Sequence, residues 1–418
     1  MTASEQLAQF AAGSKALPKL CREYKKESAT VHLKELVGGA LSFYAAAAVA
    51  KTGGVHIFVA EDRDAAAYLL NDFYNLLDEK QVYFFPSSYK RSVAYGAEDA
   101  QGVVQRTAAM NAVRGFTKGY LVVCTYPEAL AERVVDAATL QRDTIAVKLG
   151  DKISIAVLED ALADANFTRV DFVYEPGQYS VRGGIVDVFS YSESKPYRID
   201  FFGDEVDSIR RFNISSQLSA DKLDRVEIVP NLNAGEAPRV SFVQFAGSGA
   251  TCWFYDADYV LRRVNDLRRK VLADMEEPGQ IDRLLTSRNV LLRDMAGNSV
   301  VALRDNLPER PATVAVVFDT APQPKFNKNF EMLADDMIRN SLRGYATYIL
   351  SENKVQVERL ENIFHQIGRG QAAVRSLSVT LHEGFVDNDL KLCLYTDHQI
   401  FDRYQRYRIN GEIRRDEQ

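Results

Sequence analysis

The sequence predicts a multidomain α/β protein in which an α+β domain is inserted into a parallel-sheet domain and a small separate α/β domain follows. Three observations support this fold class. A chain of 418 residues is too long to fold around one hydrophobic core. Helices alternate with nearly continuous apolar strands up to about residue 125, which is typical of a parallel sheet covered on both faces. A run of short strands interrupts this alternation between about residues 127 and 214.

The first predicted domain covers residues 1–126. An alanine-rich helix follows the glycines of LVGGALSF, and the apolar strand VHIFVA comes next. A helix beginning near Arg63, the strand VYFFP, the helix VVQRTAAMNAVRGF and the strand of GYLVVCTYPEAL continue the alternation. A glycine turn that opens a helix before a parallel strand is where a nucleotide-binding protein would carry its phosphate loop.

That turn departs from the phosphate-loop pattern. The intact loop has the pattern G-x-x-x-x-G-K-[ST], in which backbone N–H groups bind phosphate, Lys adds a positive charge and the hydroxyl holds Mg²⁺. Gly38 and Gly39 supply the turn, but Ala40 and Leu41 stand where Lys and Ser or Thr would follow. Taken alone, these residues are much better explained by an ordinary turn into a buried, alanine-rich helix. We therefore expect no cofactor, no metal site and no catalytic residue.

The inserted domain is predicted at residues 127–214. The segment DKISIAVLEDALADANFTRVDFV predicts a strand, a helix and a strand, and the run from YEPGQYSVRGG to DSIRRFN predicts further strands. Gly203 and Asp204 are expected in a two-residue hairpin turn, where Gly supplies the positive φ. Arg182 and Arg198 could form cross-strand ion pairs with Asp187 and Asp200.

Mixed α/β structure is expected to resume at residues 215–320, with strands in TCWFYDA, SVVAL and TVAVVFD and a long charged helix. A motor ATPase needs a strand ending in Asp-Glu to hold Mg²⁺. Asp256 and Asp258 come closest to this pattern, and we expect them in a solvated loop.

The C-terminal part of the sequence divides into three segments. Residues 321–332 carry two prolines and are expected to form a linker. Residues 333–408 predict a small α/β domain. Residues 409–418 form a highly charged tail for which we expect no packing.

Net charge, cysteine spacing and the lack of long apolar segments limit the classes of function that we expect for this chain. A formal net charge of −6 without a long basic run predicts weak or no binding to DNA by this chain. The four cysteines are too far apart in the sequence for C-x-x-C sites and are typical of a reducing cytoplasm. The start of the chain lacks a signal-peptide pattern, and no apolar stretch is long enough to span a membrane. We expect a soluble cytoplasmic protein without membrane contact.

The stretch 174–212 carries a specific resemblance. Its strands YSVRGGIVDVFS and YRIDFFGDEVDSIRRF resemble the signature of the UvrA-binding domain shared by the excision-repair subunit UvrB and the transcription-repair coupling factors. The degenerate loop favours the coupling factors. So does the short connection between FFPS and the helix at Val103, which lacks the long Tyr-rich hairpin of UvrB. The segments PKFNKNFEMLADDM and LCLYTDHQIFDRYQRYR resemble the third domain of the coupling factors.

This resemblance implies a degenerate RecA-like domain made of residues 1–126 and 215–320, with the UvrA-binding domain at 127–214 between them. It implies a non-catalytic, bacterial, cytoplasmic module that recruits UvrA to stalled RNA polymerase in nucleotide excision repair. Its further partners would be the translocase and the polymerase-binding domain of the parent protein, and it could help to inhibit that translocase. The alternative is a UvrB-type DNA helicase or ATPase, which the missing Lys opposes.

The resemblance also implies contact residues. Arg169, Arg182 and Phe189 match positions of the UvrA contact, and an exposed patch of arginine and aromatic side chains is a typical protein interface. Ser180 stands where UvrB has a second Arg, so the contact would be weaker or differently composed. Phe189 could instead belong to the hydrophobic core.

Overall fold

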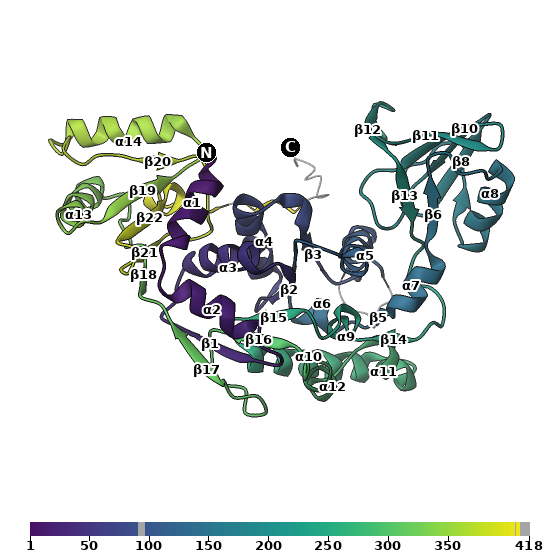
Figure 1. The fold of residues 1–418 in the computed structure, drawn as a ribbon, viewed down its shortest axis with the longest axis horizontal. Helices are drawn as coiled ribbons and strands as arrows, with labels where there is room; N and C mark the ends of the chain where they lie inside the picture. The colour runs from purple at the N-terminus through teal and green to yellow at the C-terminus, as the bar shows by residue number, and fades with distance from the viewer. Residues whose placement is uncertain (91–96, 406, 410–418) are drawn as a thin grey trace.

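The computed structural model describes residues 1–90, 97–405 and 407–409. Its helices and strands form a central unit with a second unit at one end and a third unit at the other (Figure 1). Each of the three units has its own cluster of buried apolar side chains. The multidomain α/β fold class is confirmed.

A seven-stranded parallel sheet forms the centre of the molecule, with strand order β17-β1-β16-β15-β2-β4-β3. Strands β2, β4, β15 and β16 are almost wholly buried because helices cover both faces of the sheet, with α3 and α4 above it and α10 and α12 below it in Figure 1. The strands are β1 (Thr30–Lys34), β2 (Gly54–Val59), β3 (Val82–Phe84), β4 (Tyr120–Thr125), β15 (Thr251–Phe254), β16 (Ser299–Ala302) and β17 (Val314–Val317).

The central helices follow the predicted alternation. The helix predicted near Arg63 is α4, which begins where the Asp62 side chain accepts a hydrogen bond from the backbone N–H of Ala65. The α-helices of the central unit are α1 (Ala3–Ala12), α2 (Ala16–Tyr24), α3 (Ala40–Thr52), α4 (Arg63–Leu76), α5 (Ala100–Gly115), α6 (Pro127–Ala131), α7 (Ala137–Asp143), α9 (Phe242–Ala246), α10 (Ala257–Asp274), α11 (Ile281–Leu284) and α12 (Arg288–Asp294). In the connection before α5, Tyr89 and Glu98 form an antiparallel bridge, and residues 91–96 lie outside the described residues.

The second unit contains a six-stranded sheet with strand order β12-β11-β10-β9-β8-β7. Only the short pair β7–β8 is parallel, and the other neighbours are antiparallel. Gly203 has φ 63° in the turn between β10 and β11, so the predicted hairpin is confirmed. The elements are β6 (Ile145–Lys148), α8 (Ile155–Asp164), β7 (Thr168–Arg169), β8 (Gln178–Arg182), β9 (Ile185–Val188), β10 (Tyr197–Phe202), β11 (Glu205–Phe212), β12 (Ser219–Leu223) and β13 (Arg225–Ile228).

The second hydrophobic core extends from Val147 to Ile228, whereas the sequence predicted residues 127–214 for this unit. Residues 127–144 pack on the central core, and β5 (Val134–Val135) pairs there with β14 (Arg239–Val240). Strands β12 and β13, beyond residue 214, pair with β11 and β6. The strand expected at the start of DKISIAV lies earlier in the chain, at β6.

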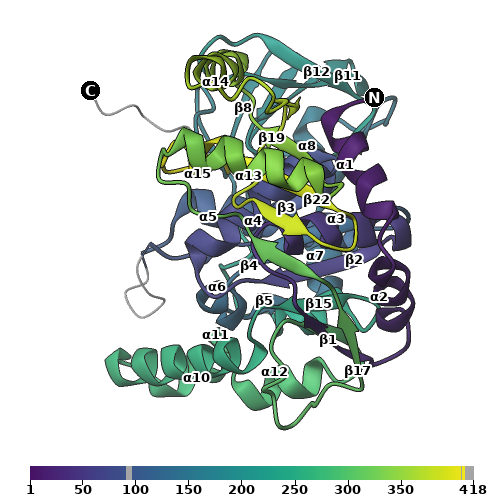
Figure 2. The ribbon, with the colours of Figure 1, turned by 90° about the vertical axis from the view of Figure 1, so that its left-hand side faces the viewer.

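The third unit has a five-stranded sheet with strand order β18-β21-β22-β19-β20, seen from its own side in Figure 2. The linker expected at residues 321–332 is wrong. Pro322 lies in the sheet, where β18 pairs with β21, and Phe326 is buried in the third core. The elements are β18 (Thr320–Pro322), α13 (Phe330–Leu342), β19 (Ala346–Leu350), α14 (Lys354–Gln366), β20 (Ser376–Leu377), β21 (Phe385–Asp387), β22 (Leu392–Thr396) and α15 (Asp397–Ile400).

The chain after α15 packs back on the central unit. Ile409 is buried, the Tyr407 hydroxyl donates to Asp64 at 2.8 Å, and the backbone N–H of Arg408 donates to the Asn71 side chain at 2.9 Å. The expectation of an unpacked tail is therefore wrong for Ile409, and residues 410–418 lie outside the described residues. None of the helices in the described ranges has the length and apolar character that a membrane crossing requires.

Candidate functional site

The glycine turn of Gly38 and Gly39 contacts the third unit. Gly38 adopts φ 55°, a left-handed conformation that favours glycine, and Gly39 precedes the first residue of α3. A Cβ atom on Gly39 would lie 2.0 Å from the carbonyl oxygen of Glu383, and one on Gly38 would lie 2.9 Å from that of Gly384. Backbone of the third unit therefore rests directly against the two glycines.

The polar groups beside this loop hold the third unit in place. The Ser42 hydroxyl donates to a carboxylate oxygen of Asp72 at 2.6 Å, and the other carboxylate oxygen accepts from the backbone N–H of His382 at 2.7 Å. Burial raises the pKa of Asp72 to about 7, although these two hydrogen bonds act in the opposite direction. The His382 ring stacks on Tyr68 with centroids 3.8 Å apart. Ser42 follows Leu41, which stands at the Ser or Thr position of an intact phosphate loop, and its hydroxyl takes part in the contact between the two units.

A cavity of about 390 Å³ lies next to this contact, at the carboxyl edge of the central sheet. Its walls include Phe58 and Trp253, and its charged residues are the acids Glu61, Asp72 and Glu383. Neither Lys nor Arg occurs among the described residues that line it. The carboxylates would repel a polyphosphate, and the described residues that line the cavity include no Lys or Arg to offset its charge.

The acidic residues at the end of β15 cap a helix and pair with other side chains of the central unit. Asp256 caps α10 by accepting from the backbone N–H of Tyr259 at 2.9 Å, and it also accepts from the Asn306 side chain at 2.9 Å. Asp258 pairs with Arg288 at 2.9 Å. Asp256 is buried, so the expectation of a solvated loop is wrong for this residue. No group of three or more metal-ligating side chains comes together in the described parts of the chain.

The three expected contact residues do not form one surface patch. Arg169 of β7 lies 2.8 Å from Glu159 of α8, the helix that covers the apolar face of the six-stranded sheet. Arg182 ends β8 on the opposite face, where it pairs with Asp187 at 2.5 Å and its side chain is 38% exposed. The Arg182 guanidinium also lies 4.9 Å from the centre of the Phe172 ring.

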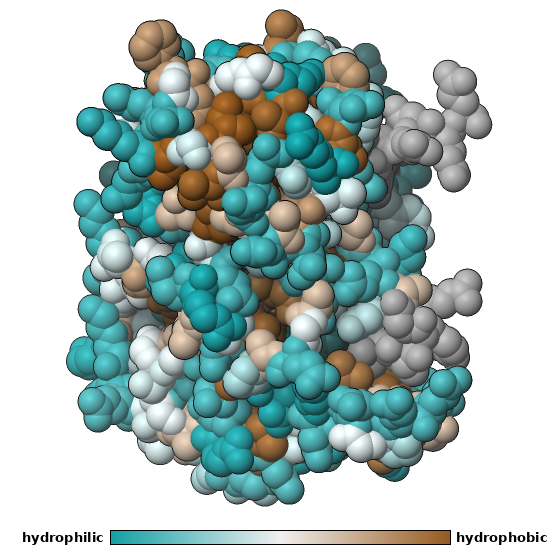
Figure 3. Space-filling view, turned by 90° about the vertical axis from the view of Figure 1, so that its right-hand side faces the viewer, coloured by the Kyte–Doolittle hydropathy of each residue, from teal (hydrophilic) through white to brown (hydrophobic). Residues whose placement is uncertain are grey.

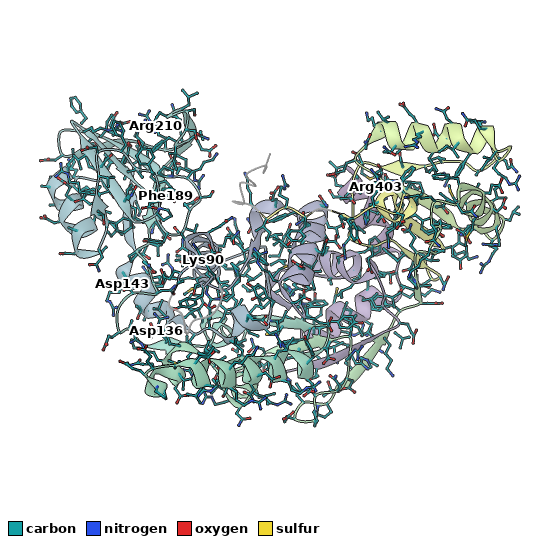
Figure 4. The ribbon with its side chains drawn as sticks, turned by 180° about the vertical axis from the view of Figure 1, so that it is seen from behind. Lys90, Asp136, Asp143, Phe189, Arg210 and Arg403 are labelled. Atoms are coloured by element: carbon teal, nitrogen blue, oxygen red, sulfur yellow. The ribbon has the colours of Figure 1, made fainter. Side chains whose placement is uncertain are left out.

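Phe189 is only 5% exposed, so the expectation that it belongs to an exposed patch is wrong. It follows β9 on the side of the second unit nearer to the central unit, whereas Arg210 lies farther out (Figure 4). Its side chain lines a cleft of about 730 Å³ together with Tyr83 and Val104 of the central unit. Phe189 therefore lies at the cleft between the second and central units with little of its side chain exposed.

The face of the six-stranded sheet opposite α8 carries a row of polar residues, of which Ser180 and Asp187 are buried. Ser180, Asp187, Arg198, Arg210 and Lys222 stand directly opposite one another on five neighbouring strands. The predicted cross-strand pairing of Arg198 is found, since its guanidinium donates to Asp187 at 2.7 Å. Sequence reasoning did not single out Arg210 and Lys222. The alternation of DSIRRF and SADKL could have placed each on one face, but their register depends on strand pairing that the sequence does not specify.

Comparisons with known proteins place these observations in context. Residues 145–233, which include the six-stranded sheet, match the family model of the UvrB interaction domain. A region that matches the UvrB interaction domain thus lies within a multidomain α/β fold.

The chain is similar to transcription-repair-coupling factors. It is 27% identical to that of Bacillus subtilis over 199 residues, which is 47% of this chain and 17% of that protein. The same figures hold for the transcription-repair-coupling factor of Escherichia coli. Identity to the one from Haemophilus influenzae is 35% over 101 residues, or 24% of this chain and 9% of that protein. The chain therefore matches less than a fifth of the length of these relatives.

Proposed function

We propose that this chain is a non-catalytic module of a transcription-repair coupling factor and acts in transcription-coupled repair by recruiting UvrA. The observation that carries the proposal is the match of residues 145–233 to the UvrB interaction domain, in a unit with its own sheet and core. The similarity to coupling factors outside this unit supports the same assignment. We propose limits of about 145–233 for the UvrA-binding unit.

The alternative, a UvrB-type helicase or ATPase, has less support. The phosphate loop lacks its Lys, and the backbone of Glu383 and Gly384 rests on Gly39 and Gly38. Asp256, the nearest candidate for an acidic Mg²⁺ ligand, is engaged in capping α10. We propose that the central unit is a scaffold that neither binds nor hydrolyses ATP.

Further partners follow from the same proposal. RNA polymerase and DNA would be engaged by parts of the coupling factor outside this chain, with weak or no DNA binding by the chain itself. The parent's translocase would contact this module when it inhibits its own motor. These partners rest on the similarity to coupling factors.

The test is a titration of purified UvrA against the complete 418-residue chain by biolayer interferometry. We expect saturable binding with a Kd in the range of about 0.1–10 μM. Lack of binding at roughly 50 μM UvrA would refute UvrA recruitment. ATP turnover by the chain, abolished by Gly39→Val, would instead favour the ATPase alternative.

A further inference from the structure

The cavity at the carboxyl edge of the central sheet has apolar walls. Phe58 of β2 and Trp253 of β15 line it, and their rings are stacked with centroids 4.9 Å apart. The indole N–H of Trp253 donates to His56 at 3.0 Å, which fixes the orientation of the ring. Further apolar lining comes from Leu36, Leu41, Leu69 and Leu303. A volume of about 390 Å³ with such walls is typical of a small-molecule site.

The position of the cavity also suits a ligand. It lies where β2 and β15 end, beside the turn of Gly38 and Gly39, and in open parallel sheets ligands bind outside the carboxyl ends of the strands. His382 and Glu383 of the third unit line it as well. Figure 3 shows other apolar residues gathered on the second unit, but these lie on an outward surface, whereas the cavity has walls from two units.

The charged residues in the described lining of this cavity are all acidic. Glu61 follows β2 and Glu383 belongs to the third unit, and both are exposed. Neither of them has an ion-pair partner within residues 1–90, 97–405 and 407–409. Asp72, in contrast, is buried and accepts from Ser42 and His382. The carboxylates of Glu61 and Glu383 are therefore available to a ligand that carries a positive charge.

Aromatic rings add a second attraction for positive charge. The ring of Tyr255, which lines the cavity, has the guanidinium of Arg304 at 5.6 Å from its centre. Arg304 pairs with Asp256 at 3.8 Å and is not among the residues that line the cavity. The face of an aromatic ring attracts a cation, most strongly in tryptophan, and Trp253 is part of the wall. The walls thus favour a cation over a neutral molecule or an anion.

We propose that the cavity binds a small organic cation, with an apolar body and one ammonium group. The apolar body lies beside Phe58 and Trp253, where it is removed from water. The ammonium group lies beside the exposed carboxylates of Glu61 and Glu383. The ligand contacts the central and third units together. This inference goes beyond UvrA recruitment and does not depend on it.

The one tryptophan of the chain reports on the cavity directly, because it is Trp253. Phenethylammonium chloride is titrated against the complete 418-residue chain at constant ionic strength. We expect a saturable change in tryptophan fluorescence with a Kd of about 0.1–5 mM, which is typical of a ligand of this size. Ethylammonium lacks the ring and should give no change. Phenethyl alcohol lacks the charge and should bind at least roughly fivefold more weakly, and the anion phenylacetate should not bind.

A pair of double variants tests the acidic residues. Glu61→Gln combined with Glu383→Gln removes the two available carboxylates and should raise the Kd for phenethylammonium by roughly tenfold. Both side chains are exposed, so the melting temperature should stay unchanged. The matched control is Glu276→Gln combined with Glu277→Gln, the same change in net charge at exposed positions beyond the end of α10. This control should keep the wild-type Kd.

The outcomes decide the inference on their own terms. Absence of a saturable change with phenethylammonium overturns it. So does equal binding of phenethyl alcohol or ethylammonium, or an equal rise in Kd in the control variant. ATP is titrated in the same assay, and ATP binding that phenethylammonium displaces would refute both this inference and the proposed scaffold role of the central unit. The titration with UvrA is a separate measurement, so its failure would refute UvrA recruitment and leave the cation site standing.

Discussion

Replacing Asp72 by Asn tests the contact between the central and third units. Asp72 is buried and accepts hydrogen bonds from the Ser42 hydroxyl and the His382 N–H. An asparagine can keep both contacts, because its carbonyl accepts from His382 and its amide donates to the Ser42 oxygen. The substitution therefore removes the ionisable proton of residue 72 and keeps its two hydrogen bonds.

The magnitude follows from the pKa of Asp72. Burial raises this pKa from its ordinary value of 3.8 to about 7 in the folded protein. A raised folded-state pKa means that the folded protein binds the proton more tightly than the unfolded chain, so the stabilisation by this proton is present below pH 4 or so and is lost as the pH rises through about 7. At roughly 1.4 kcal/mol per pKa unit the loss amounts to about 4 kcal/mol.

The assay is urea unfolding followed by the fluorescence of Trp253. The chain has one tryptophan, and it lines the cavity beside Asp72. We expect the free energy of unfolding of the wild type to fall relative to that of Asp72→Asn by about 4 kcal/mol between pH 4 and pH 8. Glu61→Gln, an exposed carboxyl at the same cavity, is the control and should follow the wild type. Parallel pH profiles for wild type and Asp72→Asn would show that Asp72 is not buried in this contact.

The remaining predictions concern the loop and the second unit. Ala40→Lys combined with Leu41→Thr should not restore ATP binding, because backbone of the third unit covers the loop; micromolar binding of a fluorescent ATP analogue would contradict this. Gly39→Ala should lower the melting temperature, since its methyl group would meet the Glu383 carbonyl, and an unchanged melting curve would refute that contact. Arg182→Ala should weaken UvrA binding by about 1–4 kcal/mol with little change in melting temperature. Phe189→Ala should cost about 3–5 kcal/mol of stability, measured by urea unfolding, because the ring is buried; a wild-type midpoint would argue for an exposed ring.

Features set by local chemistry could be predicted from the sequence. The turn at Gly203 follows from the freedom of glycine at positive φ, and the pairing of Arg198 with Asp187 follows from charges on adjacent alternating strands. The parallel sheet was predictable because strands covered on both faces are apolar throughout.

Features set by contacts between distant segments could not be predicted. The prolines around Phe326 suggested a linker, but proline is compatible with an edge strand such as β18, and the burial of Phe326 depends on the third core. For Phe189 the sequence left both an exposed and a buried position open, and its place at the cleft between two units depends on how those units pack. The contact of Gly39 with Glu383 joins residues from different units. The sequence around either residue does not predict this contact.

The pairing of β6 with β13 makes the second unit a removable module. The chain enters this unit at Ile145 and leaves it at Ile228, and these two residues stand opposite each other in the antiparallel pair. Opposed residues in such a pair have Cα atoms only about 5 Å apart, a gap that a linker of two or three residues can close. Residues 145–228 could thus be deleted, or exchanged for another domain with adjacent termini, while β5, β14 and the central sheet keep their pairing.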